Sequence, residues 1–384
     1  MVQRHPDTLT REASAGELLG AHLAGVSAQF LRALRSREQN ETAASDALSA
    51  SARRISAALH TYEPLVDAAW ARTLRTELAW LGGTLSLERR LTVQLARVHA
   101  ALHRLAANAP QGADSAADGA DTADDGTPDA SDVSAAPDAA ASAKAKADAA
   151  PAPMAIGAAR AGALLERQLT LARTRAHSAT LSAFGSARFH AVADSVALLA
   201  SDLPFTADAG APAAEALAPL AERARLRLAD EAALLPLPEA GYPHDHHALN
   251  ATLAEAPDGT HAQDAPWHRV RELLRVARYA QEVLGGTPPG GDDPARLRTA
   301  SHALDRHREA AEAARAVAAA ARTPRITPAT AYALGVLHAD QRAEVEAARH
   351  AFGRLWQRTS TAPTAAAPTA AAPTGTAPAP APAP

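Results

Sequence analysis

Apolar residues recur at helical spacing through most of this chain, and this periodicity is the feature that most limits its fold. In the first periodic segment, apolar side chains return every three or four residues, at Leu19, Leu23, Val26, Phe30 and Leu34. Aromatic residues make up only 3% of the chain, and Ala and Leu dominate its apolar share. Such a composition favours helices over sheets, which are rich in β-branched and aromatic residues. We find no strand pattern, and the sequence predicts an all-α protein.

About ten helices are expected from this periodicity and from the Pro, Gly and N-cap residues between the segments. The expected helices span residues 10–37, 43–62, 65–81, 86–106, 157–183, 186–200, 211–235, 266–284, 294–321 and 328–356. Glycines 82 and 83 mark the expected end of the third helix, and Pro266 marks the expected start of the eighth. Residues 236–264, which contain Gly, Pro and His, are expected to form a loop.

Two segments lack the apolar residues needed to build a core. Residues 108–157 consist mainly of Ala, Asp, Ser, Pro and Gly, and residues 358–384 of Pro, Ala and Thr. Both are predicted to be disordered, because they cannot bury enough surface to offset the entropy of ordering. Residues 1–10 are predicted to be a flexible terminus. The helices then form a first half at 11–107 and a remaining part at 158–357.

The net charge of −4 hides a positive foldable part. Residues 108–157 carry nine Asp and two Lys, a charge of −7, so the rest of the chain carries −4 + 7 = +3. Both lysines of the protein, Lys144 and Lys146, lie in that segment, so every other cationic side chain is Arg or His. The planar guanidinium of Arg suits bidentate contact with phosphate or carboxylate.

The absence of certain residues and patterns excludes several classes of protein. No Cys is present, which rules out disulfides, thiolate chemistry and Cys-based zinc sites. The first residues lack the apolar region of a signal peptide, and no run of 18 apolar residues predicts a transmembrane helix. A soluble cytoplasmic protein is therefore expected.

One expected helix carries a basic face. At 100° per residue, an arc of roughly 100° holds a group of cationic and aromatic side chains. The group consists of His268, Arg271, Arg275, Arg278 and Tyr279. Apolar residues such as Val270 and Ala277 lie opposite, while Glu282 falls within the basic face and Glu272 at its edge. The plain alternative is a solvated surface helix, although such faces usually mix charges of both signs. Trp267 is expected to be a packing anchor at the start of this helix.

No pattern in the sequence supports an enzyme. The chain has no phosphate-binding Walker loop, dinucleotide-binding glycine turn, nucleophile elbow or His-Glu-x-x-His helix. Residues 243–250, "PHDHHALN", hold three His and one Asp, but they sit in a loop flanked by Pro and Gly. We interpret them as an incidental polar loop and predict neither a metal site nor a cofactor.

The basic helix resembles a motif of the CHAD family, the conserved histidine α-helical domain. That motif reads His-x-x-Arg-x-x-x-(Lys/Arg)-x-x-Arg-Tyr and is present here in full, at His268, Arg271, Arg275, Arg278 and Tyr279. The resemblance covers roughly residues 11–107 and 158–357, with the acidic segment as an insertion.

The first half is similar to a second motif of the family, His-x-x-Arg-x-x-x-Arg-Arg-Leu-Arg, in a degraded form. Arg53 and Arg54 match it, whereas Asp46, Ser49 and Ser56 replace its His and two of its Arg.

A third match lies at residues 85–93, "LSLERRLTV", which resembles the family's Leu-Gly-x-x-Arg-Asp-Leu-Asp-Val. Arg89 matches its Arg, while Arg90 and Thr92 replace its two Asp.

The resemblance implies two antiparallel helical bundles related by a pseudo-twofold, with a basic groove between them that binds inorganic polyphosphate without catalysis. Members are found on polyphosphate granules in the cytoplasm, and some are fused to a CYTH triphosphate-hydrolase domain, whose Glu-x-Glu-x-Lys signature is absent here. The residues implied to bind polyphosphate are His268, Arg271, Arg275, Arg278, Arg53, Arg54 and Arg89.

Two alternatives remain at this point. The losses at Asp46, Ser49 and Ser56 suit a degenerate helical scaffold or protein-interaction module that no longer binds polyphosphate. A nucleic-acid binder is disfavoured, because few aromatic residues are available for base stacking and no basic tail is present.

Overall fold

The computed structural model describes residues 13–107, 153–238, 259–285 and 293–360. Within these ranges the chain forms nine α-helices, two short 3-10 helices and two isolated β-bridges, without a strand. The prediction of an all-α protein is confirmed.

The helices fall into two groups along the chain. The first group and its connections are α2 (Ala15–Arg35), α3 (Glu41–Thr61), η1 (Glu63–Leu65), α4 (Ala68–Ala107), α6 (Pro153–Phe184) and α7 (Ala187–Leu198). The second group, with the short helix that precedes it, is η2 (Ala207–Gly210), α8 (Ala213–Ala233), α10 (Gly259–Val283), α11 (Pro294–Ala321) and α12 (Pro328–Ser360).

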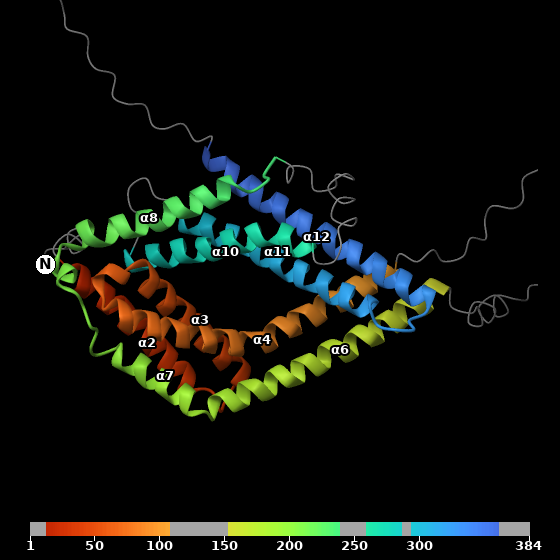
Figure 1. The fold of residues 1–384 in the computed structure, drawn as a ribbon, viewed down its shortest axis with the longest axis horizontal. Coiled ribbons are helices and arrows are strands. Elements are labelled where there is room, and N and C mark those ends of the chain that lie inside the picture. Colours follow the sequence, from red (N-terminus) through yellow and green to blue (C-terminus); the bar gives the residue numbers. More distant parts are fainter. Residues whose placement is uncertain (1–12, 108–152, 239–258, 286–292, 361–384) are drawn as a thin grey trace, which may run out of the picture.

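The order of packing is the same in both groups. In the first, α2 packs on α3, α3 on α4, and α4 on α6; in the second, α8 packs on α10, α10 on α11, and α11 on α12. The corresponding helices α3 and α10 also pack against each other. Figure 1 shows α4, α6, α11 and α12 extending together toward one end of the molecule. The two groups thus form related helical bundles that meet at α3 and α10 and again where α4 and α6 pack against α11 and α12.

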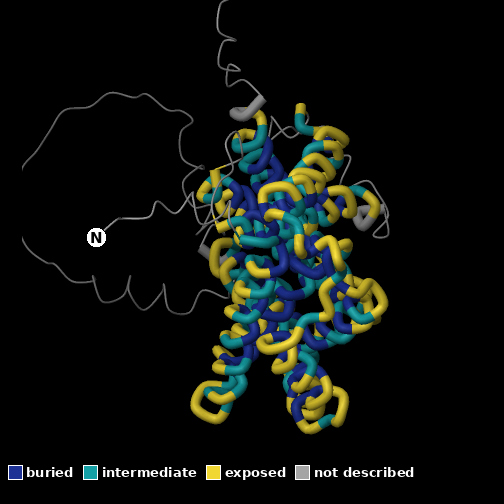
Figure 2. The backbone as a smooth tube through the Cα atoms, turned by 90° about the vertical axis from the view of Figure 1, so that its left-hand side faces the viewer, coloured by how far each residue is buried: buried dark blue, intermediate teal, exposed yellow. Residues whose placement is uncertain are grey.

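Three main apolar clusters hold these helices together. The largest joins α2, α3, the first part of α4, α7 and α8, and it reaches α10 at Ala280 and Val283. A second joins α8, α10, α11 and α12 around the buried Trp267, and a third joins α4, α6, α11 and α12. Figure 2 shows the buried residues along the middle of the molecule, with exposed residues outside. Trp267 is 1% exposed, so its expected role as a packing anchor is confirmed.

The glycine pair in the first half does not end a helix, contrary to our prediction. Helix α4 runs through Gly82 and Gly83 as one element of 40 residues. At this point α3 lies close, and the Ser49 hydroxyl donates a buried hydrogen bond of 3.3 Å to the Gly82 carbonyl. Each interior glycine costs about 1 kcal/mol relative to Ala. Packing of α4 against α3, α6 and α11 offsets that cost, so tertiary contacts override the local signal.

The start of α10 was also predicted wrongly. The helix begins at Gly259, so part of the expected loop 236–264 is helical and Pro266 lies inside the helix. The first turns are held by Asp264, which is 2% exposed and bonded to arginines of α12. These buried ion pairs stabilise helix on the N-terminal side of a proline that would otherwise begin it.

Three further boundaries differ from the predictions. Helix α2 begins after Ser14, not at Thr10, because Ser14 and Glu17 form a capping box. Helix α6 begins at Pro153 and so includes the last residues of the segment 108–157, which we had predicted to be disordered. Helix α12 continues to Ser360, beyond the expected 356.

The remaining residues of the predicted linker, of the tail 358–384 and of the terminus 1–10 lie outside the described ranges. None of the described helices combines the length and apolarity that a membrane span requires.

Candidate functional site

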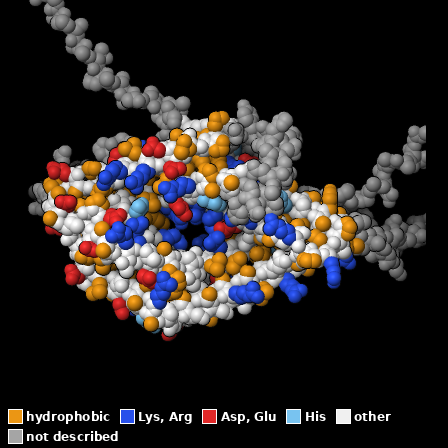
Figure 3. Space-filling view, in the orientation of Figure 1, with side chains coloured by type: hydrophobic (Ala, Val, Ile, Leu, Met, Phe, Trp, Pro, Cys, Tyr) orange, Lys and Arg blue, Asp and Glu red, His pale blue; other side chains and the backbone are white. Residues whose placement is uncertain are grey.

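Five of the seven predicted arginine and histidine positions lie where α3 meets α10. We call Arg53 and Arg54 of α3 together with Arg271, Arg275 and Arg278 of α10 the arginine row. Figure 3 shows a hollow near the middle of this face of the molecule, with Lys and Arg side chains gathered around and inside it. Both lysines of the protein lie outside the described ranges, so the cations gathered there are arginines. The positively charged hollow thus lies between the two helical groups.

Arg275 is the middle of the row and has no hydrogen bond or ion pair with the described residues. The pKa of Arg275 is lowered to about 10, first by burial and then by the nearby positive charges of Arg271 and Arg53, while the negative charge of Asp305 opposes them. Those charges place Arg53 of α3 beside the basic face of α10. A half-buried cation that lies beside two like charges and makes no ion pair of its own is the arrangement that an external anion would stabilise.

Tyr279 joins the two helices at the other end of the row. Its ring is 6% exposed, and it faces the guanidinium of Arg278 at 4.9 Å and that of Arg54 at 5.8 Å from the ring centroid. Arg278 makes no ion pair with the described residues, and its Nε is buried without a hydrogen-bond partner. Cation–π contact thus orients Arg278 without neutralising its charge.

Carboxylates neutralise other members of the row. The guanidinium of Arg271 donates a hydrogen bond of 2.6 Å from Nε to Oδ1 of Asp305 on α11, and its Nη2 lies 2.6 Å from the same oxygen in an ion pair. Arg54 lies 3.2 Å from the carboxylate of Glu282, which is one turn beyond Arg278 on α10. Arg53 donates to the Ser49 hydroxyl at 2.5 Å and has no carboxylate partner within the described chain. The row therefore has three cations without a carboxylate, Arg53, Arg275 and Arg278, between two that are paired.

His268 extends the same face of α10 toward α11. Its ring stacks edge-on against His307 at 5.4 Å. Burial lowers the pKa of His268, and the positive charges of Arg315 and Arg271 act in the same direction. The negative charges of Asp264 and Glu312 act in the opposite direction but do not outweigh burial. His268 is therefore neutral at pH 7, and the positive charge of this face comes from arginine.

Arg89 is placed apart from the row. It is an exposed residue of α4 whose Nε lies 3.4 Å from the Asp46 carboxylate of α3, with 62% of the Arg89 side chain exposed. Asp46 occupies the position where the family motif has histidine. No contact within the described ranges joins Arg89 to α10, so its part in binding stays a prediction.

Residues of α4 and α11 that we did not predict also carry charge near Arg271 and His268. Arg308 of α11 affects the pKa of Arg271, and Arg315 affects that of His268. Arg308 and Arg90 of α4 both bond the Glu312 carboxylate, at 3.1 and 2.6 Å. The only signal in the sequence was the spacing of Arg308 and Arg315 on one helix, which does not show what they face.

A buried cluster of charged and polar side chains holds the N-terminal part of α10, which precedes the arginine row, against its neighbouring helices. Asp264 accepts hydrogen bonds from Arg342 at 3.1 Å and Arg349 at 2.8 Å, and it lies 3.5 Å from Nε2 of His307. Burial alone would raise the pKa of Asp264, but the bond from His307 and the charge of Arg342 lower it overall. The Trp267 ring of α10 also stacks on His307 of α11. The cluster therefore joins α10 to both α11 and α12 next to His268.

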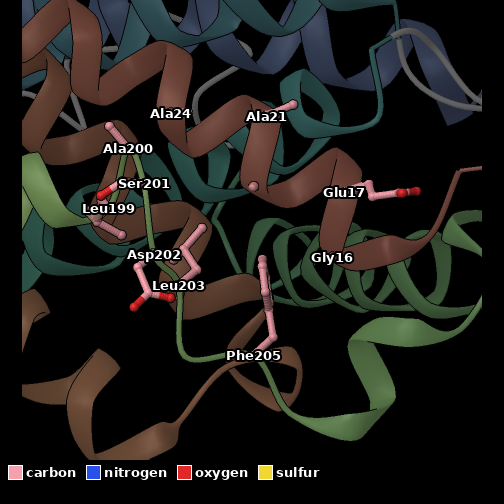
Figure 4. Close-up of a pocket in the computed structure, with 11 residues that line it drawn as sticks. Gly16, Glu17, Ala21, Ala24, Leu199, Ala200, Ser201, Asp202, Leu203 and Phe205 are labelled. Atoms are coloured by element: carbon pink, nitrogen blue, oxygen red, sulfur yellow. The ribbon is translucent and has the colours of Figure 1, made fainter.

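A separate surface pocket of about 300 Å³ is formed by α2 and residues 199–205. Figure 4 shows Phe205, Leu203 and Ser201 beside the first turns of α2. Its charged lining residues, Glu17 and Asp202, are acidic, so this pocket does not suit a polyanion. The described residues contain no cluster of His, Asp and Glu arranged to hold a metal ion. Residues 243–250 lie outside the described ranges.

Comparisons with known proteins give a family match and a similar solved structure. The CHAD domain family matches residues 17–304 of the chain. A solved structure, PptA from Streptomyces chartreusis, is 46% identical, with a TM-score of 0.69 over 90% of this chain and 100% of that chain. No curated protein matches the chain.

Proposed function

This chain belongs to the CHAD domain family, and on that premise we propose that it binds inorganic polyphosphate, without catalysis, along the arginine row. Family membership supports the ligand, and the proposal extends to an association with polyphosphate granules in the cytoplasm. The observation that carries the proposal is the unneutralised state of Arg275 and its neighbours Arg53 and Arg278.

The chemistry of these groups fits a linear chain of phosphates. Each phosphate carries about one negative charge, and a guanidinium can donate two parallel hydrogen bonds to its oxygens. From Arg271 to Arg278, α10 advances by roughly 10 Å, so its cations form a ladder rather than a point. Arg53 and Arg54 supply a second side from α3, and the ligand would lie between the two helices.

The ion pairs of the row favour a second candidate, a helical scaffold that has lost polyphosphate binding. Asp305, Glu282 and Asp46 already neutralise Arg271, Arg54 and Arg89. If these ion pairs leave the arginines unable to bind an external anion, the fold would serve only to present its helices to a protein partner.

Titration with long-chain polyphosphate at low and high salt separates the two candidates. A polyanion site releases counter-ions, so affinity should fall by about 10-fold or more between about 50 and about 200 mM salt. The variant Arg271→Ala/Arg275→Ala should lose binding while keeping its helical circular dichroism. As a matched control, Arg160→Ala/Arg167→Ala removes two exposed arginines of α6 and should bind like the unaltered protein.

Each outcome of this titration supports a different candidate function. Absence of binding by the folded protein at low salt would favour the scaffold. Equal competition by single-stranded RNA would instead indicate a general polyanion site.

A further inference from the structure

The arginine row is flanked on both sides by carboxylates, and this arrangement has a consequence for the length of ligand that it accepts. Arg275 and Arg278 occupy the middle of the ladder on α10. One turn before them, Arg271 is paired with Asp305; one turn after them, Glu282 is paired with Arg54. A phosphate chain that grows in either direction from the middle therefore meets an arginine that already has a counter-ion.

We propose that Asp305 and Glu282 are specificity-determining residues that compete with the ligand, an inference that rests on the proposed binding of polyphosphate. A short chain of a few phosphates occupies Arg53, Arg275 and Arg278 and leaves both ion pairs in place. Only a longer chain displaces the carboxylates and gains Arg271 and Arg54. The two carboxylates thus lower the affinity for long chains more than that for short ones.

The two ion pairs are not of equal strength. Arg271 has 14% of its side chain exposed and donates from Nε to Asp305 at 2.6 Å, so this pair is short and partly removed from water. Arg54 and Glu282 are separated by 3.2 Å, and about a third of each side chain is exposed. Exposed pairs are screened by solvent, whereas desolvated pairs with good geometry are costly to separate. Asp305 is therefore the stronger competitor.

A polyphosphate chain can displace Asp305 because its phosphates make the same kind of contact with Arg271, and the whole chain carries more negative charge than a single carboxylate. Phosphate oxygens accept from guanidinium groups with the geometry that carboxylate oxygens use. Displacement leaves Asp305 near solvent, where its carboxylate, 39% exposed as a side chain, can be hydrated. Only a polyanion long enough to reach Arg271 must complete this exchange, so the carboxylate acts against long ligands in particular.

The test measures the affinities of inorganic triphosphate and of long-chain polyphosphate for the full chain and for Asp305→Asn. We expect the substitution to raise the affinity for the long chain by about tenfold and that for triphosphate by less than about twofold. The weaker pair predicts a smaller gain for Glu282→Gln, about twofold and again confined to the long chain. Asp340→Asn, which removes a carboxylate paired with Arg104 at similar exposure, should change neither affinity.

A double-substitution cycle shows whether Asp305 acts through Arg271. In the Arg271→Ala background, Asp305→Asn should no longer improve binding, because the arginine that it would free is gone. A gain that persists in that background, or that is equal for both ligands, would show that Asp305 acts only as a distant negative charge and would overturn the inference. No gain at all would also overturn it.

Failure of the proposed function has a different signature. In that case the unaltered protein binds neither triphosphate nor long-chain polyphosphate at low salt. Binding by the unaltered protein together with a flat response to Asp305→Asn would refute the role of the carboxylates alone.

Discussion

Helices α3 and α10 occupy corresponding places in the two halves, yet they use different chemistry where they meet their neighbours. On α3 the buried polar residues are serines: Ser45, Ser49 and Ser51. On α10 the buried polar residues include Asp264, which anchors the helix to α12 through Arg342 and Arg349 and lies 3.5 Å from His307 of α11. Both helices keep cations on the face that they turn toward each other.

The difference explains why the first motif is incomplete. Ser49 stands where the motif has arginine, and it is 1% exposed, with its hydroxyl between Arg53 and the Gly82 carbonyl. Arg271, at the corresponding position of α10, has room to reach Asp305. The first half has therefore not merely lost a cation, because the close approach of α4 to α3 fills the space that such a side chain needs.

The largest expected effect concerns the anchor of α10. Burial lowers the pKa of His307 to about 4, below its ordinary value of 6.5. A histidine whose pKa is depressed on folding stabilises the fold above the unfolded pKa, and this stability is lost as pH falls from about 6.5 to about 4. We expect a loss on the order of 3 kcal/mol over this window.

Urea unfolding at several pH values from about 7 down to about 4 measures this dependence. The substitution His307→Gln should reduce it, whereas His302→Gln, at an exposed position of the same helix, should leave it unchanged. An identical pH dependence in the unaltered protein and in His307→Gln would refute the assignment.

The next effect compares the two sides of the arginine row in binding. Arg275→Ala/Arg278→Ala removes two cations without carboxylate partners, and we expect a loss of about 100-fold in affinity for polyphosphate. Arg53→Ala/Arg54→Ala should cost only about tenfold, because Arg54 is already paired with Glu282. Titration calorimetry at low salt distinguishes them. Equal losses would mean that the two helices contribute alike.

A smaller effect tests whether space limits the first motif. Ser49→Arg would place a cation against the Gly82 backbone, and we expect it to lower the free energy of unfolding by about 2 kcal/mol. Ser56→Arg introduces the same side chain on α3 at a half-buried position and should change stability by less than about 0.5 kcal/mol. If both variants unfold at the same urea concentration as the unaltered protein, the packing explanation is wrong.

The smallest expected change in affinity tests whether Arg89 takes part in binding. Asp46→Asn removes its counter-ion, and since this pair is exposed we expect affinity for polyphosphate to rise by only about twofold. The gain should vanish in the double variant Asp46→Asn/Arg89→Ala. If the gain survives there, Arg89 is not part of the site.

Much of the fold followed from local patterns. The bounds of α11 were predicted at residues 294–321 as they occur; in the structure Asp293 caps the helix and Pro294 stands at its first position. The turn after α10 was predicted from its glycines, and Gly285 adopts a φ of 70°. The basic face of α10 could likewise be read from the spacing of its arginines, since helical geometry alone brings them to one side.

Other features depend on residues far apart in the chain, and no local pattern shows them. The sequence determined that the protein is helical and that one helix carries a ladder of cations, because these properties depend on neighbours three and four residues away. Only the tertiary structure decided that Gly82 lies inside a helix against Ser49, and that Asp305 neutralises Arg271 while Arg275 stays unpaired. Contacts between helices select the partner of each charge, and those contacts join residues more than thirty positions apart.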